Sequence, residues 1–292
     1  MWRLYAIIGG SILLILAGLI AITITWIAPH IPYRQYEMAF LAFVDEWRLV
    51  RYDIRHDAYI FLGNTPGIVS FDWSPDGQQL VLVIDNQLMT MDVETGEIQL
   101  LYAGEDDDYF LPQWSPDGEY IAFFGSTGDM FDDIKPLRRG YILRDESLIE
   151  IPNVSHFLTW LPDSTHVAYV DENLLGNITV FNIETQEKTT ISLAITGGNL
   201  NWLSDGRLVF WQAFTTTGIE IYDLQRGVIL AFVTHPDYNY LSPNVLPDGD
   251  RIVVLASDFR YDGSQLHILD MDGNLRQRIT QFEYVAYPRW RP

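Results

Sequence analysis

Carboxylates are the side chains of this sequence whose number and spacing could do chemistry. They gather in two clusters, Glu105-Asp106-Asp107-Asp108 and Asp129 with Asp132-Asp133. Carboxylate oxygens are the ligands that calcium prefers, but neither cluster has the spacing of a calcium-binding loop. We therefore interpret both clusters as solvated connections that could contact a basic partner, and we predict no cofactor, calcium being feasible but unsupported.

Recognisable catalytic motifs are missing from the sequence. It has no G-x-S-x-G elbow, H-E-x-x-H pair, P-loop or G-x-G-x-x-G, the patterns of common nucleophile, zinc and nucleotide sites. Its six histidines are scattered, and it contains no cysteine, which excludes thiolate nucleophiles and disulfides. We predict no catalytic, cofactor-binding or metal residues, and a protein that is not an enzyme.

The net charge of the chain limits the classes of partner that it can bind. Thirty-nine acidic residues against eighteen Lys and Arg give a formal net charge of -21. Such a surface repels phosphate backbones, so we expect no nucleic acid partner. A composition with 48% hydrophobic and 14% aromatic residues is rich enough for a packed core.

A repeat organises most of the chain. Its copies are Trp73-Ser74-Pro75-Asp76-Gly77, Trp114-Ser115-Pro116-Asp117-Gly118, Trp160-Leu161-Pro162-Asp163-Ser164, Trp202-Leu203-Ser204-Asp205-Gly206, Val245-Leu246-Pro247-Asp248-Gly249 and the truncated Trp290-Arg291-Pro292. The first residues of successive copies lie 41, 46, 42, 43 and 45 residues apart. This period is typical of a four-stranded propeller blade.

Each copy is followed by strand-like segments. Short apolar runs bounded by turn residues come first, as in 80–84, 121–124, 167–170, 208–211 and 252–255. Alternating segments that end near an Asp or Asn come next, as in 88–92, 178–182, 219–223 and 266–270. Neither set has the 3.6-residue period of a helix, so the sequence predicts an all-β fold.

The pentads themselves predict tight turns. Ser accepts hydrogen bonds, Pro presets φ, Asp tolerates the third position and Gly relieves crowding at the fourth. Because Asp76 and its counterparts recur in every unit, we interpret them as turn formers rather than as a ring of catalytic carboxylates. The preceding Trp is expected to wedge between adjacent blades.

The ends of the repeated region complement each other. Residues 37–44, 47–53 and 58–63 resemble three strands of a blade that lacks its innermost strand, and 286–292 supplies only an innermost strand. Joining them would remove the exposed edges of an open ring. We predict a six-bladed β-propeller over residues 31–292 in which strand 286–292 joins strands 37–63. Seven blades is the alternative, if the irregular stretch 125–140 hides another repeat.

Aromatic residues that the repeat does not require are the better candidates for binding a partner. With the acidic residues of the connections they form the predicted partner-binding set: Asp106, Asp107, Asp108, Tyr109, Phe110, Phe131, Asp132, Asp133, Tyr238 and Tyr240.

The N-terminal segment predicts a membrane anchor. Residues 4–28 form an uncharged run long enough to cross about 30 Å of hydrocarbon as a helix. The run is longer than a signal-peptide core, and no good cleavage site follows it. We assign residues 1–30 to one transmembrane helix, with the N-terminus inside and the propeller on the extracytoplasmic side.

Trp-Ser-Pro-Asp-Gly followed by an apolar strand resembles the TolB-like, WD-type propeller repeats of bacterial envelope proteins. The resemblance covers about residues 36–292 and implies a propeller fold, while such propellers serve as scaffolds, receptors and parts of enzymes. The resemblance carries over no catalytic residues.

These observations favour a membrane-anchored scaffold that binds a protein or peptide without catalysis. The alternative is a carbohydrate-active enzyme with an acid/base pair in the propeller channel. A purely structural assembly component is a third reading, and the oligomeric state is open.

Overall fold

The computed structural model describes residues 37–104, 108–127, 137–145, 147–171, 177–193, 198–203, 205–212, 217–246, 249–258, 263–279 and 281–292. The predicted anchor, residues 1–30, lies outside these ranges, as does most of both acidic clusters. Among the residues described, no helix is both long enough and apolar enough to cross a membrane.

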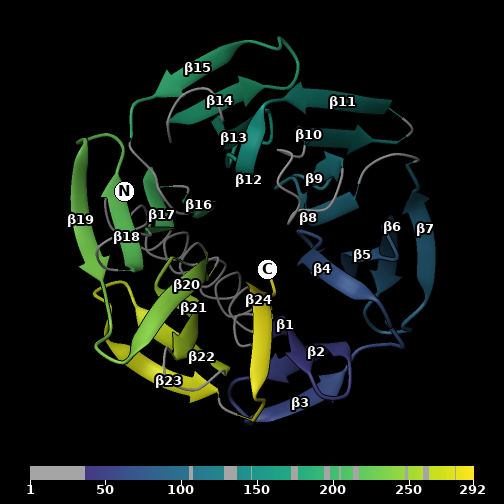
Figure 1. Cartoon of the computed structure of the whole chain (residues 1–292), viewed down its shortest axis with the longest axis vertical. Helices are drawn as coiled ribbons and strands as arrows, with labels where there is room; N and C mark the ends of the chain where they lie inside the picture. Colours follow the sequence, from purple (N-terminus) through teal and green to yellow (C-terminus); the bar gives the residue numbers. More distant parts are fainter. Residues whose placement is uncertain are drawn as a thin grey trace, which may run out of the picture. The chain divides into compact units, whose positions relative to one another are not determined.

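Six four-stranded antiparallel sheets form the described part of the chain. They are arranged around a central axis like the blades of a propeller (Figure 1). The prediction of an all-β, six-bladed propeller is therefore confirmed, and the seven-bladed alternative is wrong.

Each blade contributes an innermost strand to the centre of the ring. These strands are β4 (Ile68–Trp73), β8 (Asp108–Trp114), β12 (Val154–Trp160), β16 (Gly198–Trp202), β20 (Tyr238–Val245) and β24 (Tyr284–Trp290). The second strands are β5 (Gln79–Ile84), β9 (Ile121–Thr127), β13 (His166–Asp171), β17 (Arg207–Gln212), β21 (Arg251–Asp258) and β1 (Glu37–Phe43).

The two outer strands of each blade complete the sheets. The third strands are β6 (Gln87–Asp92), β10 (Leu137–Arg144), β14 (Ile178–Asn182), β18 (Gly218–Asp223), β22 (Ser264–Asp270) and β2 (Trp47–Asp53). The outermost are β7 (Ile98–Tyr102), β11 (Ser147–Pro152), β15 (Lys188–Ile191), β19 (Val228–Val233), β23 (Leu275–Ile279) and β3 (Ala58–Phe61).

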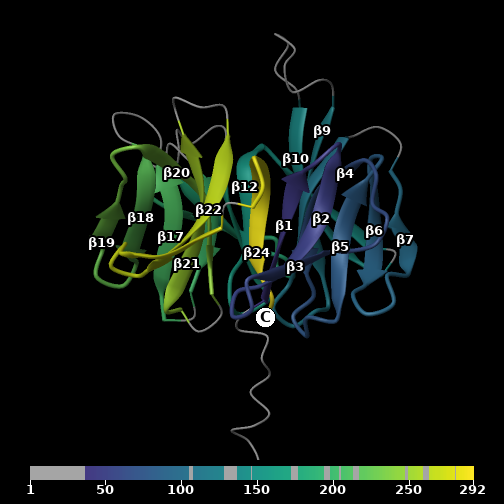
Figure 2. The same cartoon turned by 90° about the horizontal axis from the view of Figure 1, so that it is seen from below.

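One blade is built from both ends of the described chain. Its strand order is β24-β1-β2-β3, and β24 pairs antiparallel with β1, from Met38 opposite Trp290 to Phe43 opposite Tyr284. In the side view, β24 lies beside β1 (Figure 2). The pairing predicted between the last strand and the segment from Glu37 is therefore present.

Alternate residues of the second strands pack against different neighbouring blades. In β5, Leu80 and Leu82 join a cluster with residues of β1 and β4, whereas Val81 and Val83 pack with Tyr109 and other residues of the next blade. A strand that is covered on both faces loses the polar alternation of a half-exposed strand, which explains the continuous run from Leu80 to Ile84.

The pentads form the turns that join innermost to second strands. Ser74 Oγ donates to Asp76 Oδ1 at 2.6 Å, and the Gly77 amide donates to the Ser74 carbonyl at 2.8 Å. Gly77 has φ of +64°, a conformation that favours glycine. The turn role predicted for this Asp is confirmed, and we call the face of the ring that holds these turns the pentad face.

Candidate functional site

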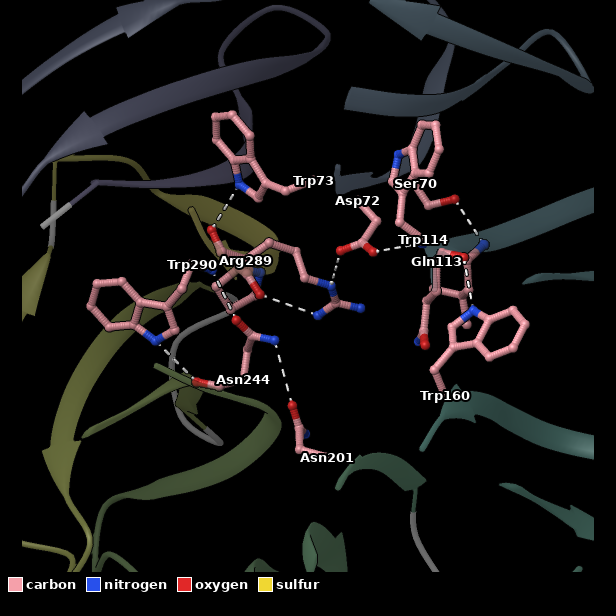
Figure 3. Close-up of polar contacts among 12 residues, drawn as sticks. Ser70, Asp72, Trp73, Gln113, Trp114, Trp160, Asn201, Asn244, Arg289 and Trp290 are labelled. Carbon is pink, nitrogen blue, oxygen red and sulfur yellow. Dashed lines mark hydrogen bonds and ion pairs between the residues drawn. The ribbon is translucent and has the colours of Figure 1, made fainter. Parts of the chain in front are cut away.

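The position just before each repeat mark supplies a polar side chain to the central channel. All six of these residues line one cavity of about 470 Å³. We call them the polar ring: Asp72, Gln113, Thr159, Asn201, Asn244 and Arg289. Figure 3 shows five of them around the channel, so six strands far apart in sequence build a single site.

Irregularities in the innermost strands position the polar ring. Leu111, Asn199, Ser242 and Tyr287 each lie three residues before a mark, and all four have φ near +50°. The pairing of each of their strands with its second strand shifts register there. Such a bulge bends the strand and turns the side chains that follow it. The register also shifts in β4 and β12, so an irregularity of this kind occurs in all six innermost strands.

Tryptophans of the marks hold neighbouring blades together beside the channel. The indole N–H of Trp73 donates to the Arg289 carbonyl at 3.3 Å, and that of Trp160 to the Gln113 carbonyl at 3.2 Å. Trp290 donates likewise to Asn244 at 3.1 Å. Each acceptor is a polar-ring residue of the preceding blade. The predicted wedging of these rings between blades is therefore confirmed.

One ion pair spans the boundary between β24 and β4. Arg289 Nε lies 3.6 Å from Asp72 Oδ1, and the two side chains are 11% and 19% exposed. The Trp114 amide donates to Asp72 Oδ2 at 3.1 Å. Burial raises the pKa of Asp72 to about 6, although the Arg289 charge and the two backbone donors, Trp114 and Trp73, oppose that rise.

On the other side of the polar ring, the side chains of Asn201 and Asn244 form hydrogen bonds with each other and with the backbone. Asn244 Oδ1 accepts from the Trp290 amide at 2.9 Å, and Asn244 Nδ2 lies 3.5 Å from Asn201 Oδ1. Asn201 Nδ2 donates to the Pro243 carbonyl at 2.8 Å. This sector of the polar ring is fixed by its own hydrogen bonds.

The cavity opens toward the pentad face. A second hollow of about 370 Å³ shares Asp72, Trp114 and Arg289 with the first and reaches the turn residues Pro75 and Pro116. The mouth therefore combines tryptophan and proline surfaces with the polar ring beneath them. Amphipathic surfaces of this kind are typical of ligand sites.

The partner-binding residues predicted from the sequence lie elsewhere. Asp108, Phe110 and Tyr238 lie at or near the starts of β8 and β20, at the end of the channel away from the pentads. Asp108 is exposed, whereas Phe110 and Tyr238 are half-buried. Asp106, Asp107, Phe131, Asp132 and Asp133 lie outside the described residues.

Two of the predicted contact residues belong to the core. Tyr109 is 5% exposed and Tyr240 is 2% exposed, because inward alternation along β8 and β20 places both rings between blades. Tyr109 packs edge-on to Phe123, and the Tyr240 hydroxyl lies 3.1 Å from Nδ1 of His267. This corrects their interpretation as loop aromatics free to contact a partner.

The polar ring was missed by sequence reasoning, although a signal was present. The residue before every mark is polar, while its identity changes from copy to copy. A repeated position that is always polar, but is occupied by different residue types, indicates residues that line a cavity rather than residues that form a turn or a core. Metal binding has no comparable basis, since no three His, Asp or Glu side chains in the described ranges gather to hold an ion.

Comparisons with known proteins agree with this architecture. No protein-family model matches the chain. WD repeat-containing protein SL1-17 of Schistosoma mansoni is 24% identical over 173 residues, which are 58% of this chain and 54% of that protein. The chain thus spans about half the length of this curated relative.

Solved structures share the fold at low identity. TolB from Acinetobacter baumannii has a TM-score of 0.72 and 16% identity, over 88% of this chain and 66% of that one. An oligogalacturonate lyase in complex with manganese has a TM-score of 0.61 and 17% identity, over 84% and 74%. The chain thus has the fold of a six-bladed β-propeller, similar to that of TolB. Structural neighbours with this fold include both TolB and an enzyme, so the fold leaves the activity open.

Proposed function

We propose that this protein is a non-catalytic binding module that takes up an extended segment of a protein or peptide at the pentad-face mouth of its channel. The polar ring carries this proposal, because it brings one hydrogen-bonding side chain from every blade to a single cavity of about 470 Å³. Extended backbone offers alternating donors and acceptors, which such a mixed ring can pair. The likeness to TolB supports a protein-binding role.

Photo-crosslinking tests where the partner binds. A photoreactive phenylalanine analogue replaces Gln113 at the mouth, Asp108 at the opposite end, or the exposed Leu100 on outer strand β7. We expect full-length protein in native membranes to give a discrete adduct from position 113 and none from position 100. Adducts from 108 alone would move the site to the opposite end, and identical adducts from 100 and 113 would contradict a channel site.

We further propose that residues 1–30 anchor the protein as a single membrane pass, with the propeller outside the cytoplasm. The uncharged run 4–28 supports this proposal. Full-length protein should resist extraction from membranes by alkaline carbonate, and a variant lacking residues 2–30 should be released. Protease added to intact cells or spheroplasts should reach the propeller; protection would contradict the orientation.

A carbohydrate-active enzyme is the second candidate, because Asp72 combines a place in the cavity with a pKa raised to about 6. A carboxyl that holds its proton near neutral pH can act as a general acid. The other carboxylate in the described lining, Asp205, is paired with Arg207 at 2.7 Å. If the second candidate holds, the protein should hydrolyse a polysaccharide such as polygalacturonate and release reducing ends, detectable by a reducing-sugar assay, and Asp72→Asn should abolish this release.

A further inference from the structure

The polar ring is divided into a satisfied sector and an open sector. The side-chain amides of Asn201 and Asn244 form hydrogen bonds with each other and with neighbouring backbone groups. By contrast, the Gln113 amide and the Thr159 hydroxyl have no hydrogen-bond partner among the described residues. A ligand therefore finds unused hydrogen-bonding capacity at Gln113, Thr159 and the adjoining ion pair.

Arg289 supplies the strongest unused donor of the open sector. Its Nη1 donates to the Pro288 carbonyl at 3.2 Å and its Nε faces Asp72 at 3.6 Å, whereas Nη2 has no partner among the described residues. The guanidinium is planar and presents its N–H groups as a fork. One edge of this fork remains free inside the cavity.

The charged acceptor of the same sector, Asp72, is already engaged. Asp72 receives the Trp114 amide on Oδ2 and faces Arg289 through Oδ1. The ion pair is also long for a charge-assisted contact, which is usually about 2.7 to 2.9 Å. The open sector therefore offers a charged donor rather than a charged acceptor.

We propose that the polar ring binds a carboxylate of its peptide ligand, with the free edge of Arg289 as the charged contact and Gln113 as a neutral donor. This inference rests on the proposed peptide-binding function and names the chemistry of the recognised group. A carboxylate matches the guanidinium fork with two parallel hydrogen bonds, which gives orientation as well as affinity.

Binding should couple to the protonation of Asp72. An incoming carboxylate adds a negative charge near a carboxyl that is already held near a pKa of about 6 by burial, so the complex favours the protonated form. The other described charged groups in the cavity wall are Asp205 and Arg207, which pair with each other. Burial raises the pKa of Tyr287, although the Arg289 charge opposes that rise, so Tyr287 stays neutral.

The test follows indole N–H resonances of the full-length protein, labelled with 15N at its nine tryptophans, in a neutral detergent. Trp114→Phe assigns the reporter beside Asp72. The probes are N-acetyl-Gly-Gly-Ala with a free carboxylate, the same peptide as its C-terminal amide, N-acetyl-Gly-Gly-Lys amide, and digalacturonate. We expect the free-acid peptide to shift the Trp114 signal saturably and to bind more tightly than the other three probes, with affinity about tenfold or more above that of its amide.

Substitutions separate charge from fold. Arg289→Gln should weaken binding of the free acid by about tenfold or more, and Arg289→Lys should retain part of it, because an ammonium keeps the charge and loses the fork. The matched control is Arg276→Gln, which removes the exposed arginine of β23 that pairs with Asp270 of β22, and this variant should bind as the wild type does. Gln113→Ala gives an independent variant if Arg289→Gln fails to fold.

The pH dependence adds a second readout. Free-acid affinity should rise severalfold from about pH 7.5 to about pH 5.5, and Asp72→Asn should bind at both pH values with the same affinity. Equal binding of acid and amide would overturn the carboxylate proposal and leave peptide binding intact. Preference for the lysine peptide over the free-acid peptide would overturn it in favour of a cationic ligand. Preference for digalacturonate, whose carboxylates belong to a sugar, would overturn the assignment of the carboxylate to a peptide. Loss of the crosslink at position 113 would instead overturn the proposed function.

Discussion

At the scale of single residues, two buried ionisable groups have pKa values shifted in opposite senses. Burial raises the pKa of Asp72 to about 6, and burial lowers the pKa of His267 to about 4, assisted by Arg278 and His235. His267 is fully buried beside the Tyr240 hydroxyl, and its Nε2 has no hydrogen-bond partner in the described part of the chain. Both groups are therefore neutral in the folded protein between about pH 4 and pH 6.

The two groups affect stability with opposite signs. Between about pH 4 and pH 6 the folded state binds the Asp72 proton more readily than the unfolded state, so the Asp72 contribution falls as pH rises. In about the same range the unfolded state protonates His267 while the folded state does not, so the His267 contribution falls as pH drops. Each amounts to roughly 2 to 3 kcal/mol, and together they largely offset.

We expect Asp72→Asn to uncover the His267 contribution. The free energy of unfolding of this variant, relative to the wild type, should fall by up to about 3 kcal/mol as pH drops from about 6.5 to about 4. His267→Gln should show the reverse trend. Urea unfolding at a series of pH values measures both, and Asp205→Asn, in a half-exposed ion pair, is the control. Parallel curves for Asp72→Asn and the wild type would contradict the raised pKa.

At the scale of elements, the bulged inner strands store backbone strain next to the channel. Leu111, Asn199, Ser242 and Tyr287 all have φ near +50°, which L-residues rarely adopt and which costs them about 1 kcal/mol each. Strain of this kind persists where surrounding structure imposes it. In this protein the strained residues lie at the bulges that direct the polar-ring side chains into the cavity.

Ser242→Gly should therefore stabilise the protein by about 0.5 to 1 kcal/mol, because glycine reaches positive φ without a steric cost. Ser242→Val should destabilise it by more than about 1 kcal/mol, since a β-branched side chain is poorly suited to that conformation. Urea unfolding measures both changes. Ser257→Gly, in the extended strand β21, is the matched control and should destabilise; equal effects at 242 and 257 would argue against strain at the bulge.

The end of β24 is fixed by one buried arginine. Arg291 is 9% exposed, donates from Nε to the Gly77 carbonyl at 2.9 Å and pairs with Glu37 of β1. Its guanidinium also lies over the Trp73 ring, 5.2 Å from the centroid. The side chain thus joins β24, β1 and the pentad turn of the neighbouring blade.

Arg291→Ala should lower the free energy of unfolding by about 2 to 4 kcal/mol, because it removes the cation over Trp73 and leaves Glu37 without its partner. Arg276→Ala, which breaks an exposed ion pair, should cost no more than about 0.5 kcal/mol. Denaturant unfolding compares the two. Equal losses would show that Arg291 acts only as a surface charge.

At the scale of the whole molecule, the ring depends on β24 as the shared element of the composite blade. Without it, β1 presents an open edge and the blades of β4 and β20 lose a neighbour. We expect a variant lacking residues 284–292 to unfold at lower denaturant concentration and with reduced cooperativity, since a ring with an exposed edge is no longer closed.

Hydrogen exchange should locate this defect. Amides of β1, β2 and β20 should lose protection in the truncated variant, whereas those of β13, in a blade distant from the gap, should keep more of theirs. A synthetic peptide of residues 283–292 added in trans should restore protection of β1. Uniform loss of protection with no rescue would show that β24 is needed for folding itself rather than for closure.

Much of this architecture could be predicted from the sequence, because each blade has local markers. The Trp marks and Ser-Pro-Asp-Gly turns fixed the blade spacing, and strands such as β2 and β14 agree with the predicted ranges. The polar ring could not be derived in that way, since Asp72 and Arg289 become neighbours only when the ring closes. Tyr109 was misinterpreted because the acidic residues before it resemble a loop, whereas it already belongs to β8.

The ion pair between Arg289 and Asp72 lies across the junction where β24 meets β4. Arg291, two residues farther along, secures that same junction. Assembly of the proposed binding surface and completion of the propeller are therefore one event, because Asp72 lacks its partner Arg289 until β24 is in place. A partially folded molecule would then be unable to bind the proposed ligand. A ligand bound to Arg289 of β24 and Gln113 of β8 would help to hold β24 beside β1, a pairing that no chain connection secures.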